Sequence, residues 1–203
     1  MKPYQKMHGK NGLENALFPL EELYCTRGSH HGDDYNYDFL GYVNNERVYK
    51  CPLYASFSGK VVYVGSLASN TPTVVWESLN QVNFVDGSVD YMCISISHDD
   101  NFGSYNIGDI KNQGEIFAHT GTTGEGTGDH THLICGKGKF NGFYTTPKGG
   151  YTLKNQYDLP LCLGVNNTTL LQPLTFNWQS FTSDYGKKDF IVLSLVNALK
   201  WSV

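Results

Sequence analysis

The sequence predicts a mainly β fold, an antiparallel sheet or small sandwich, on three observations. First, the chain has 22 Gly, 14 Tyr and only 17% charged residues, a composition that favours short strands and turns over helices. Second, short β-branched or alternating apolar runs recur along the chain. Third, turn residues separate these runs at regular intervals, which is typical of antiparallel sheets and sandwiches.

The expected elements follow in chain order. Residues 1–29 are expected to form an irregular lead-in with a short helix near 13–23. Five segments are predicted as strands: Lys60–Gly65, Thr73–Trp76, Met92–Ser97, Ile116–His119 and His130–Cys135. Between the last two, residues 120–129 (TGTTGEGTGD) hold four Gly and four Thr and are predicted as a loop.

The C-terminal third has weaker signals. Residues 159–165 are strand-like, and the apolar residues of 189–201 fall near one helical face, which predicts a short C-terminal helix. We expect a main domain over residues 1–160, including the lead-in. Residues 161–203 are expected to be a C-terminal extension that completes the fold or links to another part.

Composition and charge exclude several functions. The formal net charge is −4 with no Lys/Arg cluster, which argues against a nucleic-acid partner. The longest apolar stretch, residues 190–199, is too short to span a bilayer, and the first residues do not read as a signal peptide. The five cysteines are odd in number and lack a CxxC pair, which argues against a disulfide framework or a Cys-rich zinc module.

The chemistry-bearing residues begin with a pair of histidines, His130 and His132, in the segment His-Thr-His. Residues i and i+2 of a strand point to the same side, so both imidazoles are expected to project into one cleft. A histidine pair on a solvated strand is the plainer interpretation. The preceding Gly- and Thr-rich loop favours a site, because it lets backbone pass close to a substrate.

Two further segments carry histidines. Residues 28–39 (GSHHGDDYNYDF) hold two His and three Asp, the nitrogen and oxygen donors that zinc accepts. His98 follows an apolar strand at the point where a loop begins, a common position for a site residue. Taken alone, each segment is also compatible with a solvated polar loop.

In order and type, these segments resemble the lysostaphin-type zinc endopeptidases, most closely the versions in bacteriophage tail-tip and lytic proteins. The resemblance runs from about residue 28 to residue 134. It includes residues 55–62 (ASFSGKVV), the apolar strand ending in His98, and residues 108–115 (GDIKNQGE). Its most specific part is residues 121–132 (GTTGEGTGDHTH), which fit the closing family pattern G-x-T-G-x-x-T-G-x-H-x-H.

The resemblance implies a role for each matching residue. His132 and Asp38 would be zinc ligands, and His98 and His130 would be catalytic histidines that do not bind the metal. Two histidines are alternatives for the first ligand. The family motif Ser-His-x-Gly selects His30, whereas the family's spacing of seven residues to the aspartate selects His31. A shorter pattern, H-x-G-x-D, would pair His30 with Asp34 instead, but Asp38 fits better because it lies in a strand-like context and leads into the next element at the expected distance. His8 and His119 match nothing in the pattern and are interpreted as structural or surface residues.

The implied protein is a Zn²⁺-dependent endopeptidase that cuts peptide bonds of bacterial peptidoglycan, encoded by a phage for wall penetration or lysis. Its partners would be the stem or cross-bridge peptide of peptidoglycan and other phage tail proteins. It would be located in the virion tail or released to the bacterial wall. The alternative is a catalytically inactive relative with a structural or wall-binding role in a phage tail.

Overall fold

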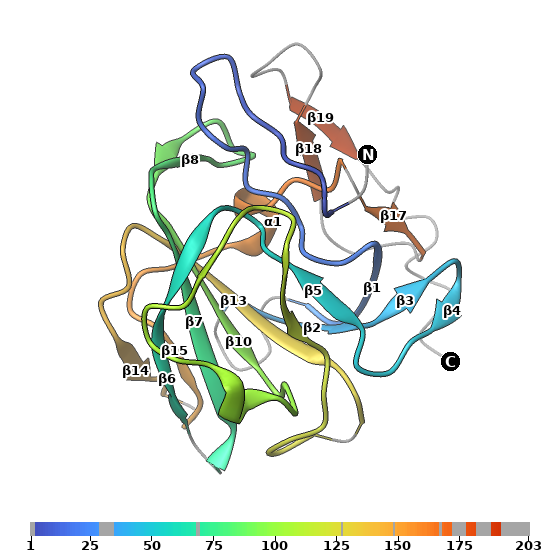
Figure 1. Cartoon of the computed structure of the whole chain (residues 1–203), viewed down its shortest axis with the longest axis vertical. Coiled ribbons are helices and arrows are strands. Elements are labelled where there is room, and N and C mark those ends of the chain that lie inside the picture. The colour runs from blue at the N-terminus through green and yellow to red at the C-terminus, as the bar shows by residue number, and fades with distance from the viewer. Residues whose placement is uncertain are drawn as a thin grey trace.

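The computed structural model describes residues 3–28, 35–67, 70–126, 128–147, 149–166, 168–171, 178–181 and 188–191. Nine of the described strands form one central sheet in the order β11-β6-β7-β10-β13-β2-β1-β17, with β16 also paired to β13 (Figure 1). They are β11 (Ile110–Lys111), β6 (Gly59–Ser66), β7 (Pro72–Ser78), β10 (Met92–Ser97), β13 (Thr131–Lys137), β2 (Asn36–Leu40), β1 (Glu22–Arg27), β17 (Thr169–Leu170) and β16 (Gln156–Tyr157). Neighbours in this sheet are antiparallel, except that β1 and β17 are parallel.

Short antiparallel pairs surround the central sheet in the described part of the chain. They are β5 (Pro52–Tyr54) with β12 (Ile116–His119), β3 (Tyr42–Val43) with β4 (Glu46–Arg47), β8 (Val82–Asn83) with β9 (Val89–Asp90), β14 (Phe143–Thr145) with β15 (Tyr151–Leu153), and β18 (Trp178–Phe181) with β19 (Lys188–Ile191). The described elements also include the 3₁₀ helix η2 (Phe102–Ser104) and the α-helix α1 (Leu159–Cys162). The predicted mainly β, antiparallel fold is therefore confirmed.

The core lies on both faces of the central strands. Every residue of β7 and β10 is buried. Because successive residues of a strand point to opposite faces, Val74 and Trp76 enter the larger apolar cluster, whereas Val75 enters a smaller one. The smaller cluster is completed by Ile134 and by Phe143 of β14. This burial on both faces fixes the central strands that carry the site.

The five predicted strand segments are confirmed within a residue or two of their ends, but the helix expected near residues 13–23 is wrong. Residues 15–20 are buried one after another in backbone that is not helical, and β1 begins at Glu22. The amide N–H groups of Ala16 and Phe18 donate to the carbonyls of Asn83 and Gly164. Tertiary pairing with distant segments thus replaces the local helix.

Two other expectations change. The strand-like residues 159–165 begin with α1, where Pro160 stands in the first turn, a position at which proline favours a helix. A helix is expected over 189–201, but residues 189–191 belong to the strand β19. Residues 192–203 lie outside the described part of the chain.

The extension expected over 161–203 contributes part of α1 and the edge strand β17 to this fold. Four of the five cysteines are buried, and all five are free thiols. In the part of the chain that the structure describes, no helix has the length and apolar character needed to cross a bilayer.

Candidate metal and catalytic site

Three neighbouring strands bring the candidate residues together. Asp38 lies on β2 and His132 on β13, and the two are direct partners in the ladder between these strands. On the other side of β13, His132 is paired with Ser97, the last residue of β10, and His98 follows at once. The sheet order thus places residues 94 positions apart in the sequence side by side.

Asp38 and His132 are joined by a short polar contact. Asp38 Oδ1 lies 2.7 Å from His132 Nδ1, and the two side chains are 11% and 23% exposed. Burial by itself raises the pKa of the Asp38 carboxyl. The hydrogen bond with His132 and the charges of His132, His130 and Arg27 outweigh it and hold that pKa below its ordinary value. The Asp38 side chain is therefore an ionised carboxylate at neutral pH, and its oxygens could bind a metal ion.

The two other histidines lie beside this pair. The ring centroids of His98 and His130 are 4.3 Å apart, and those of His98 and His132 are 6.3 Å apart. His98 Nδ1 lies 3.0 Å from the carbonyl oxygen of Thr123, and His130 Nδ1 lies 2.7 Å from that of Gly128. A carbonyl oxygen only accepts, so in both rings Nδ1 carries the hydrogen and, in the neutral ring, Nε2 keeps a lone pair.

Burial lowers the pKa of His98 to about 4, although the Thr123 carbonyl opposes this shift. His98 is therefore neutral at pH 7. A neutral imidazole with a free Nε2 is suited to accept a proton or a hydrogen bond in the cleft.

The backbone at His98 is unusual for a residue with a side chain. Its φ of 79° lies in the left-handed region, which a non-glycine residue adopts rarely and at a free-energy cost. A hydrogen bond from the Thr123 amide to the His98 carbonyl holds it there. Gly121 allows the loop to approach, because a Cβ at this position would lie 2.2 Å from the His98 carbonyl oxygen.

The four side chains line one cleft with a volume of about 960 Å³. Arg47 and Tyr49 lie along the same cleft, as does Tyr151. Such a cleft is large enough to admit an extended peptide segment.

The remaining candidates divide into two groups. His30, His31 and Asp34 lie outside the described residues, in the segment that directly precedes Tyr35 and β2. His119 lies in β12, where its amide N–H donates to Asp99, and His8 forms an isolated bridge with Glu14. Neither of these two histidines lines the cleft.

Sequence reasoning missed the polar residues that hold the histidine loops. Asp129 precedes His130 and binds Arg47 and Lys50, and Asp100 follows His98 by two residues and binds Lys50. The closeness of Asp129 and Asp100 to candidate histidines in the sequence was a signal that could have identified them. No sequence signal indicated that residues 47–50 bind these two aspartates.

The donor set at Asp38 and His132 fits zinc, which accepts carboxylate oxygen and imidazole nitrogen. Among the described residues, no group of three or more His, Cys, Asp or Glu side chains is arranged to hold a metal ion. The described residues therefore bring together two of the side chains expected as metal ligands, Asp38 and His132. The third expected ligand, His30 or His31, belongs to the segment before β2.

Comparison with known proteins gives a phage relative. No family model matches the chain. The chain is 30% identical over 184 residues to a protein named Morphogenesis protein 1, from Bacillus phage B103. The match covers 87% of this chain and 47% of that protein, so the chain spans about half the length of the curated relative it matches.

Several solved structures are similar at low scores. The catalytic domain of the antimicrobial peptidase lysostaphin from Staphylococcus simulans has a TM-score of 0.38 and 21% identity, over 68% of this chain and 84% of that one. A zinc-containing peptidase from Vibrio cholerae has a TM-score of 0.42 and 16% identity, over 76% of this chain and 47% of that one.

Proposed function

We propose that this chain is a zinc-dependent endopeptidase that hydrolyses peptide bonds of bacterial peptidoglycan. The observation that supports this most is the convergence of Asp38, His98, His130 and His132 on one cleft. The set combines a pair of metal donors with two imidazoles whose Nδ1 atoms are already engaged. The sequence motifs resemble those of lysostaphin-type endopeptidases, and this resemblance favours peptide hydrolysis as the reaction.

In this proposal, Asp38, His132 and one of His30 and His31 hold the metal. A set of three protein ligands would be that of a catalytic zinc, since structural zinc sites use four protein ligands. When bound, zinc supplies a Lewis acid that polarises a carbonyl and lowers the pKa of a water molecule.

His98 and His130 share the proton transfers. One of them, as the neutral ring, accepts the proton of the attacking water through Nε2. The other, in its protonated form, donates a hydrogen bond from Nε2 to the developing oxyanion and gives a proton to the leaving amine. The neutral state of His98 at pH 7 suits the base, since a protonated ring could not accept. The Thr123 and Gly128 carbonyls keep both rings oriented during these transfers.

The proposed substrate is the stem or cross-bridge peptide of peptidoglycan. We further propose that the protein is phage-encoded, acts in wall penetration or lysis, and is carried in the virion tail or released to the wall. The 30% identity to a phage protein named for morphogenesis supports this source. Other tail proteins are then its partners.

The test is the loss of turbidity of purified peptidoglycan from several bacterial species, without chelator, with chelator, and with zinc restored. We expect clearing that stops with chelator and returns with zinc, together with new amino termini in the released fragments. His130→Ala is the matched control and should not clear. Zinc-loaded protein that clears no wall type would contradict the proposal and favour a structural role in a phage tail.

A further inference from the structure

Asp129, the residue before His130, has a buried carboxylate that the proposed mechanism does not use. Its side chain is 3% exposed. Burial of a carboxylate is unfavourable unless donors surround it, so its partners indicate what it holds in place. Three groups donate to this carboxylate: the Arg47 guanidinium and the Lys50 amide from a distant segment, and the Thr120 hydroxyl from the preceding loop.

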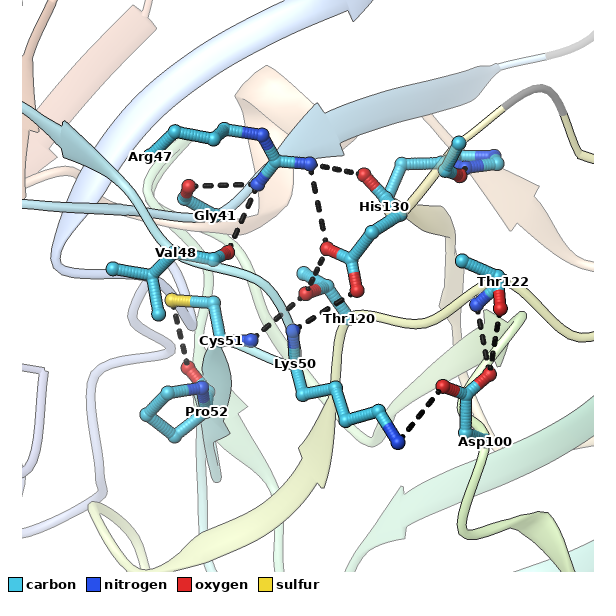
Figure 2. A network of polar contacts seen from close by, with 12 residues as sticks. Gly41, Arg47, Val48, Lys50, Cys51, Pro52, Asp100, Thr120, Thr122 and His130 are labelled. Atoms are coloured by element: carbon cyan, nitrogen blue, oxygen red, sulfur yellow. Dashed lines mark hydrogen bonds and ion pairs between the residues drawn. The ribbon is translucent and has the colours of Figure 1, made fainter.

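Arg47 is itself firmly anchored. Its Nη1 donates to the carbonyls of Gly41 at 2.8 Å and Val48 at 3.0 Å, as the dashed lines in Figure 2 show. Its Nη2 donates to the Asp129 backbone carbonyl and lies 3.3 Å from Asp129 Oδ1. The guanidinium thus clamps both the main chain and the side chain of Asp129.

The other carboxylate contacts come from Lys50, the residue before Cys51, and from Thr120, which is hydrogen-bonded to Cys51. The Lys50 amide donates to Asp129 Oδ2 at 2.9 Å, and the Thr120 hydroxyl donates to Asp129 Oδ1 at 2.6 Å. The Thr120 oxygen in turn accepts from the Cys51 amide at 2.9 Å. Lys50 adopts a left-handed φ of 53°, a conformation that is rare for a residue with a side chain.

The contacts of Asp129 are linked to His130 through Thr120 and Gly121 on one side and through Gly128 on the other. Thr120 is followed by Gly121, and Gly121 and His130 exchange two backbone hydrogen bonds of 3.0 Å. On the other side, the Gly128 carbonyl accepts the Nδ1 hydrogen of His130 at 2.7 Å. Fixing Asp129 therefore fixes the peptide units that place the ring and its Nδ1 acceptor.

We propose that Asp129 is a positioning residue that sets the ring orientation and tautomer of His130. With Nδ1–H held on the Gly128 carbonyl, Nε2 of His130 stays available to the cleft. The catalytic consequence rests on the proposed function, whereas the effect on the imidazole does not. Arg47 and the Lys50 amide act through Asp129.

The competing explanation is that the Arg47–Asp129 pair only stabilises the fold. A buried ion pair is a poor stabiliser compared with apolar packing, because removing both charges from water offsets their attraction. A purely structural role would change the unfolding free energy and leave the tautomer of His130 in the folded protein unaltered. The two explanations therefore differ in an observable that does not require activity.

The first measurement is the ¹⁵N chemical shifts of the His130 ring in the full chain, in the wild type and in Asp129→Asn. Asparagine keeps the shape but places an NH₂ donor against donors that formerly faced a carboxylate oxygen. We expect the wild type to show protonated Nδ1 and unprotonated Nε2, and the variant to show exchange between both tautomers. The matched control is Asp86→Asn, which removes a carboxylate bound by Ser88 and Tyr157, away from the three histidines that line the cleft.

The second measurement is peptide hydrolysis by the zinc-loaded variants. We expect Asp129→Asn to lower kcat at least tenfold with KM changed less than twofold, and to have no further effect in a His130→Ala background. Thr120→Val, which removes one donor, should give a smaller change in the same direction and serves if Asp129→Asn does not fold. Unchanged ¹⁵N shifts in a folded variant would overturn the proposal, even if the chain proves inactive on every wall.

Discussion

Asp38 Oδ1 lies 2.7 Å from His132 Nδ1, directly across the ladder between β2 and β13. The contact is a hydrogen bond in which the imidazole donates to an ionised carboxylate. Carboxylate oxygen and imidazole nitrogen are both ligands that zinc accepts, so in the proposed function these two side chains would hold the metal. This relationship makes the pair the structural basis for the proposed metal centre.

Substitution of each histidine of the His-Thr-His segment should distinguish a loss of metal binding from a loss of catalysis. His132→Ala removes a ligand, so we expect loss of both zinc and activity. His130→Ala should retain one zinc per chain and lose about 10²–10⁴-fold in rate, the usual contribution of a general acid or base. Metal content by mass spectrometry and peptide hydrolysis on both variants check this. Equal zinc loss in both would reverse or refute the assignment.

Asp38→Asn tests whether Asp38 binds the metal or only orients His132. The substitution keeps the size of the side chain and removes its charge. Loss of a residue that merely orients a ligand lowers metal affinity by about 10–100-fold, so we expect a larger loss for a true ligand. Competition against a fluorescent zinc chelator measures the affinity. A loss of less than 100-fold would instead make Asp38 an orienting partner of His132.

The strands that carry the site could be predicted from the sequence, because β-branched and alternating runs are local signals. The alternation also predicted that His130 and His132 project into one cleft, and both line it. The lead-in could not be predicted, because the backbone of Ala16 and Phe18 is held by hydrogen bonds to residues far along the chain.

The supporting residues of the site could not be predicted for a related reason. Arg47 and Asp129 are 82 positions apart, and neither lies in a pattern that indicates the other. Their contact exists only because the β3–β4 hairpin folds back against the loop that precedes β13. Sequence patterns identified residues with chemically distinctive side chains, whereas the contacts that orient these side chains depend on tertiary structure.

Asp100 should contribute a stability that is lost in acid. The Thr122 amide, with the Thr123 hydroxyl and Lys50, lowers the pKa of its carboxyl to about 2. The unfolded value is about 3.9, so between these values the unfolded chain binds more protons and stability rises with pH. The stabilising contribution is thus fully present above about pH 4 and declines as the pH falls through 2.

Asp100→Asn checks this by urea unfolding at a series of pH values. The difference in unfolding free energy between wild type and variant should be constant above about pH 4 and shrink towards pH 2. Lys50→Met removes only one exposed ion-pair partner and should have a much smaller effect. A difference that does not change with pH would show that the Asp100 carboxylate contributes nothing through its charge.

Gly121→Ala should disturb both the fold and His98. A Cβ at residue 121 would lie 2.2 Å from the His98 carbonyl oxygen and 2.7 Å from the Asp100 nitrogen, so the loop must move. Overpacking of this kind costs about 1–3 kcal/mol of stability, and the displaced loop should also lower the hydrolysis rate. Gly103→Ala is the matched control, because nothing lies within 4 Å of its added Cβ. Urea unfolding and hydrolysis on both variants measure the effect, and equal behaviour of the two would mean that the approach of the loop to His98 does not constrain the site.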